Sequence, residues 1–241
     1  AGIKTKASRE DVTLVVSDRP ATAAGVYTTN LVFAAPVAWD RALTPGRGFR
    51  AVVVNSGNAN ACTGARGLDD ARSMAAAAGA AIGAAAEEVL VLSTGIIGEF
   101  LPLETIRKGI AAARERLGAD DAAAVTAARG MMTTDTRPKL AGAEFTAAGT
   151  PCGVFGMAKG AAMIGPRLAT MLGVVLTDAA VEPDDAQRLL REAAEVSFNC
   201  VSVDGHMSTN DTVLLLANGA AGGDALHGDG LAAFGRALTD V

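Results

Sequence analysis

The sequence predicts an α/β protein, or a related α+β protein, in which helices and strands pack in layers. Short runs rich in Val, Leu and Ala are typical of strands covered on both faces, and they occur among longer alanine-rich segments typical of helices. Half of the 241 residues are apolar, so one large domain or two small ones can bury a sizeable core. The order of strands and helices shows no clean βαβ rhythm.

The expected strands are marked by β-branched residues between turn formers. In chain order they are Val12–Ser17, Gly25–Tyr27, Ala51–Asn55, Val89–Ser93, Met171–Leu176 and Thr212–Ala217. The expected helices, which are rich in alanine, are Asp69–Glu88, Leu103–Leu117, Asp120–Met131 and Pro183–Val196. Pro183 suits the first turn of a helix. The glycine-containing stretch Ala220–Asp229 is expected to be a loop.

Charge and cysteine content limit the partners. The formal net charge is −5 and no basic stripe is visible, which argues against a nucleic-acid ligand. Cys62, Cys152 and Cys200 show no paired spacing, so neither a disulfide framework nor a zinc site is expected. No apolar run is long enough to cross a bilayer and no signal peptide is recognisable. We therefore expect a cytoplasmic protein that acts on a small polar substrate.

The usual catalytic and cofactor motifs are weak or missing. A triad could pair Cys62 with His206, but a lone cysteine after a strand is more often a core residue. Asp204, His206 and Asp211 could bind a metal, but such a group is more often hydrogen-bonded within a turn. No G-x-G-x-x-G follows a strand, and no G-x-x-x-x-G-K-[ST] occurs. No metal or cofactor is expected.

Small polar residues and glycine gather at four places where strands or helices end. These segments are 55–60, 93–95, 133–136 and 208–211. Asn, Ser, Thr and Gly form turns in any protein, so one such loop indicates little. Four of them in one chain favour a site in which backbone N–H groups approach a ligand.

Thr170 opens an apolar run directly after Ala169. One interpretation is an ordinary buried threonine at the start of a strand. The other is that its Oγ attacks the Ala169 carbonyl and cuts the chain, so that the new α-amine serves as the base for the hydroxyl. An α-amine has a pKa of about 7.7–8.0 and can act near neutral pH without histidine.

Six blocks of sequence resemble a known family in the same order. They are V-V-V-N-S-G-N-A-N-A-C-T-G, S-T-G-I-I-G, M-T-T-D-T-R-P-K, G-M-A-K-G-A-A-M-I-G-P, A-T-M-L and D-G-H-M-S-T-N-D-T-V-L-L-L-A-N-G. Together they resemble the glutamate N-acetyltransferase/ornithine acetyltransferase family of arginine biosynthesis. The resemblance implies the layered α/β sandwich of the ornithine acetyltransferase and DmpA-like N-terminal-nucleophile type. It covers nearly the whole chain.

The resemblance also implies self-cleavage between Ala169 and Thr170. The products would be an α chain of residues 1–169 and a β chain that begins at residue 170. Thr170 would be both the nucleophile and the new N-terminus. Compared with the family, residues 170–241 would be only the N-terminal part of that β chain, because the resemblance implies a further C-terminal portion.

Four more residues fall on the family's functional positions. Thr94 and Gly95 match its oxyanion hole, and Thr133 and Lys159, with Thr170, match its substrate-binding positions. The implied reaction moves an acetyl group from N2-acetylornithine to glutamate through an ester on Thr170, and acetyl-CoA is a further possible donor. The family usually assembles as an (αβ)2 pair. Alternatives are an N-terminal-nucleophile amidase or aminopeptidase, a family member in an antibiotic pathway, and an inert homologue.

Overall fold

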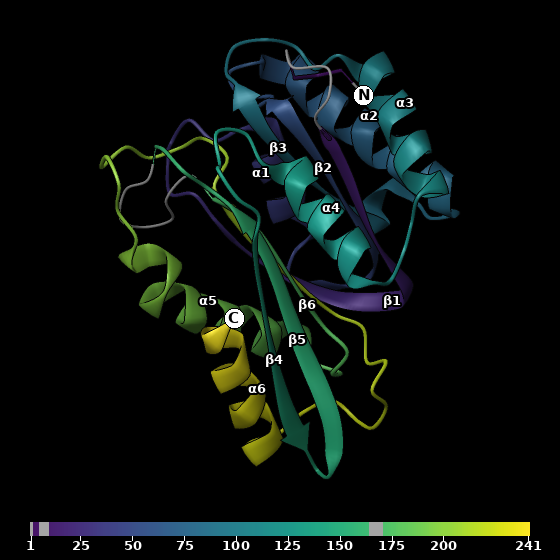
Figure 1. The fold of residues 1–241 in the computed structure, drawn as a ribbon, viewed down its shortest axis with the longest axis vertical. Helices are drawn as coiled ribbons and strands as arrows, with labels where there is room; N and C mark the ends of the chain where they lie inside the picture. The colour runs from purple at the N-terminus through teal and green to yellow at the C-terminus, as the bar shows by residue number, and fades with distance from the viewer. Residues whose placement is uncertain (1, 5–9, 164–170) are drawn as a thin grey trace.

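The computed structural model describes residues 2–4, 10–163 and 171–241. Its strands are β1 (Val12–Tyr27), β2 (Gly46–Asn58), β3 (Val89–Ile96), β4 (Lys139–Ala147), β5 (Thr150–Lys159), β6 (Leu172–Thr177) and β7 (Thr212–Ala217). Its helices are α1 (Ala35–Leu43), α2 (Gly64–Ile82), α3 (Leu103–Glu115), α4 (Asp121–Met131), α5 (Pro183–Val196) and α6 (Gly228–Asp240), with 3-10 turns at Ala86–Glu88 and Phe198–Cys200. The strands form one sheet in the order β3-β2-β1-β7-β6-β5-β4 (Figure 1).

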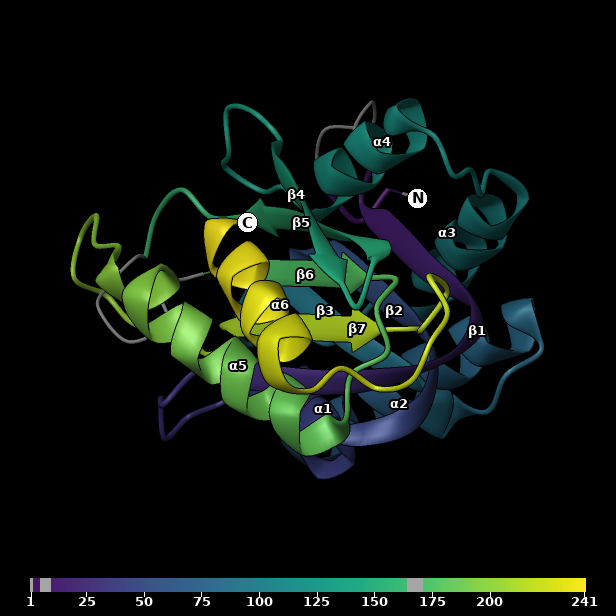
Figure 2. The ribbon, with the colours of Figure 1, turned by 90° about the horizontal axis from the view of Figure 1, so that it is seen from below.

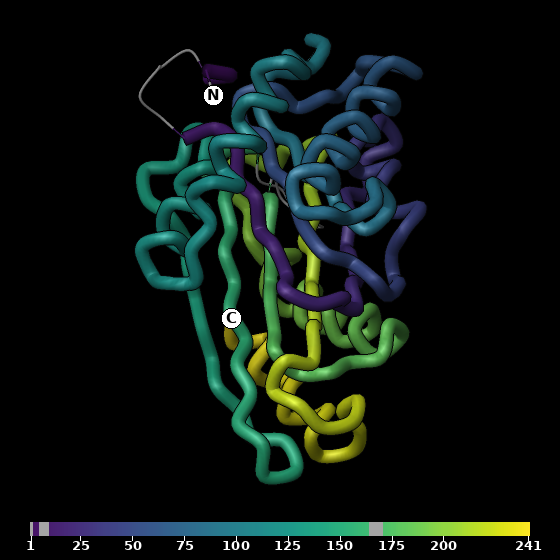
Figure 3. Tube along the Cα trace, turned by 90° about the vertical axis from the view of Figure 1, so that its right-hand side faces the viewer, coloured from purple at the N-terminus to yellow at the C-terminus, as the bar shows by residue number. Residues whose placement is uncertain are grey.

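A bend in β1 folds this sheet into two layers. Val16 pairs with Ala51 of β2, but Ala21 pairs with Phe49, so the register shifts between them. Pro20 lies in the shifted stretch and has no N–H to give to a ladder. The tube of β1, purple in Figure 3, changes direction here. The first half of β1 therefore pairs only with β2, and the second half also pairs with β7.

The two layers face each other across a shared apolar core. Val52, Val54, Leu90 and Leu92 of β2 and β3 belong to the same buried cluster as residues of β6 and β7. From the latter layer come Leu172, Val174, Leu214 and Leu216. Figure 2 shows β2 and β3 lying behind β6 and β7. Since alternate residues of a strand point to opposite faces, the remaining side chains of these strands point outward.

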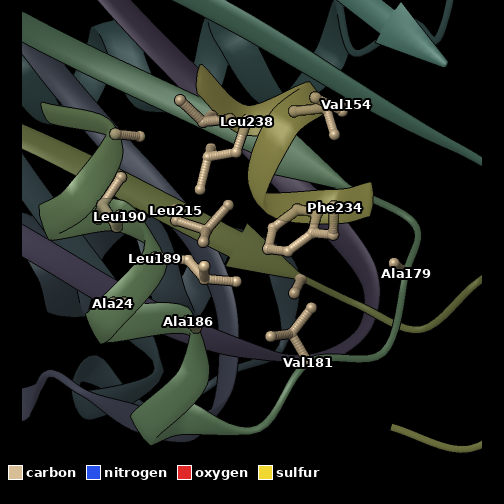
Figure 4. Packing of buried hydrophobic residues seen from close by; sticks show 14 of the residues in the cluster. Ala24, Val154, Ala179, Val181, Ala186, Leu189, Leu190, Leu215, Phe234 and Leu238 are labelled. Atoms are coloured by element: carbon tan, nitrogen blue, oxygen red, sulfur yellow. The ribbon is translucent and has the colours of Figure 1, made fainter. Parts of the chain in front are cut away.

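Helices cover both outer faces. On the outer face of β6 and β7, Leu215 packs against Leu189 and Leu190 of α5 and Phe234 of α6 (Figure 4). On the outer face of β2 and β3, α2 and α3 cover a separate cluster that includes Met74. The architecture is therefore a helix–sheet–sheet–helix sandwich, as predicted. Two parallel crossovers build it, β2–α2–β3 and β6–α5–β7, which the irregular order of elements in the sequence concealed.

Most predicted elements are confirmed, with three corrections. The bounds of β7 and α5 are the predicted ones, and α3 and α4 begin and end within two residues of prediction. The two short strands expected before residue 28 are a single bent strand, β1. The helix expected over Asp69–Glu88 begins earlier, at Gly64, and ends at Ile82, because the next residue, Gly83, has a left-handed backbone (φ +75°) that stops it. The loop expected to extend to Asp229 ends two residues earlier, at His227, because α6 begins at Gly228.

Four elements, α1, β4, β5 and α6, were not predicted. The hairpin β4–β5 is rich in Ala and Gly, and most of β4 is exposed, so it lacks both the β-branched content and the apolar alternation that mark a strand. Its turn is Ala148-Gly149, with φ of +49° and +83°. Alanine is an unusual residue for that conformation, which hid the turn in the sequence.

Candidate active site

The candidate site lies where the two sheet layers meet at one end. Thr94 and Gly95, at the end of β3, come from the first layer. Lys159 ends β5 in the second layer. Asn210 joins the layers, because its Nδ2 donates to the carbonyl of Ala59 at 2.7 Å and to that of Ser93 at 2.8 Å. Asn210 is buried, so these bonds fix the spacing of the layers in a place without competing water.

The asparagine-rich loop after β2 is a buried support for the end of β3. Ser93 Oγ donates to Asn55 Oδ1 at 2.6 Å, and Asn55 Nδ2 donates to the Asn58 carbonyl at 2.8 Å. Asn60 Nδ2 donates to the Gly67 carbonyl at 2.9 Å. The three asparagines are 4% exposed or less. Turn-forming residues thus serve here as a satisfied polar network, which rigidifies the site.

Gly95 occupies a position that no other residue fits. Its φ is +137°, and an added Cβ would lie 2.2 Å from the Gly57 carbonyl carbon on β2. Thr94, just before it, is 5% exposed, while Gly95 itself is exposed. The backbone of residue 95 is therefore held tightly against β2 and remains open to solvent. Such an uncovered backbone can approach a reacting group closely.

Lys159 is a buried cation that reaches across the two layers. The residue is 2% exposed, and its Nζ donates to Thr94 Oγ1 at 2.6 Å. Burial lowers the pKa of Lys159 to about 8, although the carboxylates of Asp135 and Asp211 oppose this shift. Because Thr94 Oγ1 accepts this bond, its own proton remains available to donate elsewhere. The ammonium group has two further N–H donors, for which no acceptor is found among the described residues.

Asp135 connects the segment that contains Thr133 to the segment that contains Lys159. Its Oδ1 accepts from the Gly160 N–H at 2.7 Å and from Lys139 Nζ at 2.5 Å, and its Oδ2 accepts from the Thr133 N–H at 3.3 Å. Burial would raise the pKa of Asp135, but the Lys139 ammonium and the two N–H groups outweigh it and hold the pKa below its usual value. The Asp135 carboxylate therefore joins the backbone of Thr133 to that of Gly160, the residue next to Lys159.

Asp211 immediately precedes β7 and is 1% exposed. Its Oδ1 accepts from the Met171 N–H at 3.1 Å. Its Oδ2 is buried and accepts no hydrogen bond from the described residues. Burial raises the pKa of Asp211 to about 7, against the opposing effects of the Met171 N–H and Lys159.

The predicted nucleophile and cleavage site, Thr170 and Ala169, lie outside the described residues. Met171, the next residue along the chain, is described and buried. Its carbonyl accepts from the Thr212 N–H at 3.0 Å, and its N–H binds Asp211. The structure thus brings Thr94, Gly95, Thr133, Lys159 and the residue following Thr170 to the same end of the sandwich.

The alternative sites weighed from the sequence are less well built. Cys62 is exposed, and His206, whose side chain is 74% exposed, has Asp204 at 3.5 Å. Among the described residues no three His, Cys, Asp or Glu side chains are grouped as a metal site requires. A hollow of about 650 Å³ lies at the opposite end of β5 and β6 from Lys159. Its lining includes Glu144 and Asp178 but none of the predicted site residues.

Asn210 and the Met171 contact of Asp211 were not foreseen. The sequence offered one signal: Asn210 and Asp211 directly precede the fully buried strand β7. Polar residues that run without a break into a buried strand are themselves buried, and they must then find partners. Neither partner could be named from the sequence, because Ser93 lies 117 positions from Asn210, and Met171 lies 40 positions from Asp211.

Known proteins match this chain from end to end. The ArgJ family profile matches residues 1–241. The chain belongs to the ArgJ family. It is 51% identical to the Arginine biosynthesis bifunctional protein ArgJ of Geobacter sulfurreducens, covering all of this chain and 61% of that protein. It likewise spans 53% of the ArgJ protein of Rhodopirellula baltica, so it corresponds to little more than half the length of these relatives.

Solved structures agree with the ArgJ assignment. Ornithine acetyltransferase of Mycobacterium tuberculosis, solved in complex with ornithine, is 36% identical over 68% of this chain and 86% of that chain, with a TM-score of 0.60. An L-aminopeptidase D-Ala-esterase/amidase of Ochrobactrum anthropi, described as a new variant among the Ntn hydrolase fold, is 11% identical with a TM-score of 0.55. It covers 97% of this chain and 71% of that chain. At this identity the likeness concerns the fold alone. No helix among the described residues could span a membrane.

Proposed function

We propose that this ArgJ-family chain is part of a self-cleaving acetyltransferase that moves the acetyl group of N2-acetylornithine to glutamate. The observation that carries the proposal is the buried contact between Lys159 Nζ and Thr94 Oγ1, 2.6 Å long, beside the uncovered backbone of Gly95. A cation, a hydroxyl and a backbone N–H gathered at one point can stabilise the negative charge that develops on a carbonyl oxygen. The position of Met171, whose N–H binds Asp211 beside β7, supports the proposal.

In the proposed processing step, Thr170 Oγ attacks the Ala169 carbonyl and the Ala169–Thr170 amide becomes an ester. Water then hydrolyses the ester. The products are an α chain that ends at Ala169 and a β chain that begins at Thr170. The division of the chain into 1–169 and 170–241 is part of this proposal. The new α-amine of Thr170 can take the proton of its own hydroxyl, so no histidine is needed.

In the transfer step, Thr170 Oγ attacks the acetyl carbonyl while the α-amine accepts the hydroxyl proton. Thr94 Oγ1–H and the Gly95 N–H donate to the oxyanion, and the proton then passes to the departing ornithine amine. The amine of glutamate attacks the resulting acetyl ester and regenerates Thr170. Lys159, held by Thr94, can pair with a substrate carboxylate, and Thr133 contributes to the same pocket.

Three further features belong to the proposal. Acetyl-CoA is a second possible acetyl donor, no cofactor takes part, and the cleaved units assemble as (αβ)2. We also place the enzyme in the cytoplasm, as expected from the sequence, although curated fungal relatives such as that of Penicillium rubens are named mitochondrial. The small polar substrates and the formal net charge of −5 support this placement.

Acceptor dependence tests the function. The purified protein is given N2-acetylornithine with and without glutamate, and N-acetylglutamate and ornithine are quantified. We expect N-acetylglutamate and continued turnover only when glutamate is present, because without it ornithine release stops at about one equivalent per active site, when Thr170 is acetylated. Thr170→Ala should remain one chain and lose turnover, while Thr150→Ala, at the opposite end of β5 from Lys159, should behave like the parent protein. Release of ornithine at the same rate without glutamate would indicate an amidase instead.

A further inference from the structure

Asn210 lies at the candidate site, and the proposed reaction gives it no role. The residue is 6% exposed, and both polar ends of its amide are hydrogen-bonded. Its Oδ1 accepts from Thr209 Oγ1 at 2.6 Å, and its Nδ2 gives its two protons to the carbonyls of Ala59 and Ser93. The reverse orientation would direct the amide oxygen at two carbonyl oxygens, so this network fixes the amide.

These hydrogen bonds close a ring around the proposed oxyanion-hole pair, residues 94 and 95. The Ala59 N–H donates to the Ile96 carbonyl at 2.8 Å, and the Ala59 carbonyl accepts from Asn210. The ring runs from Asn210 to Ser93 and along β3 to Ile96. It returns through Ala59 to the same amide. The pair is therefore held between two anchored carbonyls, and both anchors depend on one buried side chain.

The outer edge of β3 is capped by side chains. In the order of the described strands β3 is the last of the sheet, so this edge needs other partners. Side chains of α1 bind the Val89 carbonyl at 3.0 Å and the Val91 N–H at 2.8 Å, and Asn210 binds the next alternate residue, Ser93. Alternate residues direct their N–H and C=O groups to the same edge, and the register against β2 is unbroken as far as Gly95. The Gly95 N–H therefore points to this edge, just beyond the Asn210 contact.

Asn210 belongs to the layer that contains Lys159. It lies two residues before β7, and β7 and β5 are strands of the same layer. From this layer Lys159 Nζ donates to Thr94 Oγ1 at 2.6 Å. Both side chains therefore reach across to β3, where they bind consecutive residues, Ser93 and Thr94. The amide thus sets where β3 ends relative to the cation.

We propose that Asn210 is a positioning residue, which holds the segment Ser93–Ile96 so that the Thr94 hydroxyl and the Gly95 N–H reach the developing oxyanion together. The inference rests on the proposed function. Both Nδ2 protons are used, so the amide has no donor left for a substrate, and no proton passes through it. An oxyanion forms when the enzyme is acetylated and again when glutamate attacks. A displaced donor pair slows both steps, whereas binding of the substrates before reaction does not depend on it.

Asn210→Ala tests this role through the division between kcat and KM. The kcat is calculated per active site, counted from the ornithine that the protein releases without glutamate. We expect kcat to fall about 30-fold, while KM for N2-acetylornithine and for glutamate stays within about threefold. Counting the sites removes any loss that comes from misfolded protein.

A double-mutant cycle with Thr94 separates positioning from general structural damage. In Thr94→Val the hydroxyl donor is already missing, so adding Asn210→Ala should cost less than about fivefold. Asn218→Ala is the matched control, because Asn218 follows β7 at its opposite end and its Nδ2 donates to Ser17 Oγ at 3.3 Å. It should leave kcat within about twofold and add nothing to the loss in Thr94→Val.

The outcomes distinguish this inference from the proposed function. If Asn210→Ala keeps the parental kcat per site, or if its loss multiplies in full with that of Thr94→Val, the positioning role is refuted while the acetyltransferase stands. If the parent protein forms no N-acetylglutamate, the proposed function itself fails.

Thr209→Val covers the case in which Asn210→Ala does not fold. Valine keeps the branched shape of Thr209 but removes the hydroxyl that holds Asn210 Oδ1, so the amide keeps its donors and loses its fixed orientation. We expect kcat per site to fall about three- to tenfold with KM unchanged, and this loss to shrink in the Thr94→Val background. A Thr209→Val protein with the parental kcat would overturn the assignment.

Discussion

Asp40 and Asp211 form two nearly identical contacts in different surroundings. Each is buried, each accepts a backbone N–H through Oδ1, from Val91 at 2.8 Å and from Met171 at 3.1 Å, and each leaves Oδ2 unpartnered. Beside Asp40 lies the phenol of Tyr27, and burial raises the pKa of both groups. Asp211 instead faces Lys159, which offsets part of its desolvation and leaves its pKa at about 7.

The difference shows what a buried cation contributes. Without one, desolvation favours the protonated form of a buried carboxyl group, and burial accordingly raises the pKa of Asp40. With one nearby, the same group can ionise near neutral pH and can act on a second cation. Groups whose pKa is shifted in this way by a specific charged partner gather at functional sites. This contrast supports the proposal that the active site lies at the Lys159 end of the sandwich.

Replacing Lys159, the cation that distinguishes the surroundings of Asp211 from those of Asp40, should have the largest effect on activity. In Lys159→Met the Thr94 hydroxyl loses its donor and Asp211 loses its cation, so we expect kcat/KM for acetyl transfer to fall about 100-fold or more. Lys139→Met is the control, because Lys139 is 43% exposed where it pairs with Asp135, and it should cost less than about tenfold. Equal losses in the two variants would show that burial of Lys159 is not what matters.

Gly95→Ala tests the rigid layer that faces Lys159. The added Cβ would overlap the Gly57 carbonyl carbon, and φ at this position is +137°. We expect the free energy of unfolding to fall by about 3 kcal/mol, as measured by urea denaturation. Gly153→Ala on β5 meets no atom within 4 Å of the new Cβ and should change stability by less than about 1 kcal/mol. A Gly95→Ala protein as stable as Gly153→Ala would disprove the close approach.

The pH dependence of stability should separate the two aspartates. Both have folded-state pKa values above the unfolded value of about 3.9, so each group stabilises the fold below about pH 4 and loses this contribution as pH rises towards its folded-state pKa. The slope is at most about 1.4 kcal/mol per pH unit for each group. Relative to the parent protein, Asp40→Asn and Asp211→Asn should therefore become more stable as pH rises.

For Asp211→Asn this gain should level off above about pH 7. Urea melts at intervals of half a pH unit would measure both curves. A gain that shrinks with rising pH in either variant would mean that the aspartate is ionised throughout, contrary to the effect of its burial.

The smallest effect is expected at an exposed charge cluster. Arg188 on α5 pairs with Asp185 at 2.7 Å and with Glu192 at 3.3 Å, and its side chain is 49% exposed. Solvent screens such pairs, so Arg188→Gln should lower stability by no more than about 0.5 kcal/mol and leave the kinetics unchanged. Thermal melts in low and high salt would check this. A loss comparable to that of Gly95→Ala would contradict the distinction between buried and exposed charge.

The sequence predicted the fold well where local signals and burial agree. Apolar strands such as β7, and a helix with Pro and Asp in its first turn such as α5, were found with their bounds. The Ala- and Gly-rich hairpin β4–β5 was missed, because a strand with an exposed face and few β-branched residues has no distinct local pattern. Pro20 marks the bend in β1, but the continuation of the strand through it depends on pairing with β2 and β7, which lie far away in the sequence.

The candidate site, like the fold, was predicted from the sequence only in part. Motif resemblance named Thr94, Gly95, Thr133 and Lys159, because these residues stand in recognisable blocks. The physical relations among them are long-range: the Lys159–Thr94 bond spans 65 positions. Whether a lysine is buried, and beside which carboxylate, depends on how the sheet folds into two layers. The sequence could therefore predict which residues belong to the candidate site. It could not predict that Lys159 is buried, or which carboxylates and hydroxyls lie beside it.

The most direct test of the central claim is mass and N-terminal analysis of the purified protein together with its Thr170→Ala variant. We expect two polypeptides from the parent protein, one ending at Ala169 and the other beginning at Thr170, in preparations that transfer acetyl groups to glutamate. The variant should remain uncut and inactive. A parent protein that turns over substrate while the Ala169–Thr170 bond stays intact would contradict the proposed mechanism.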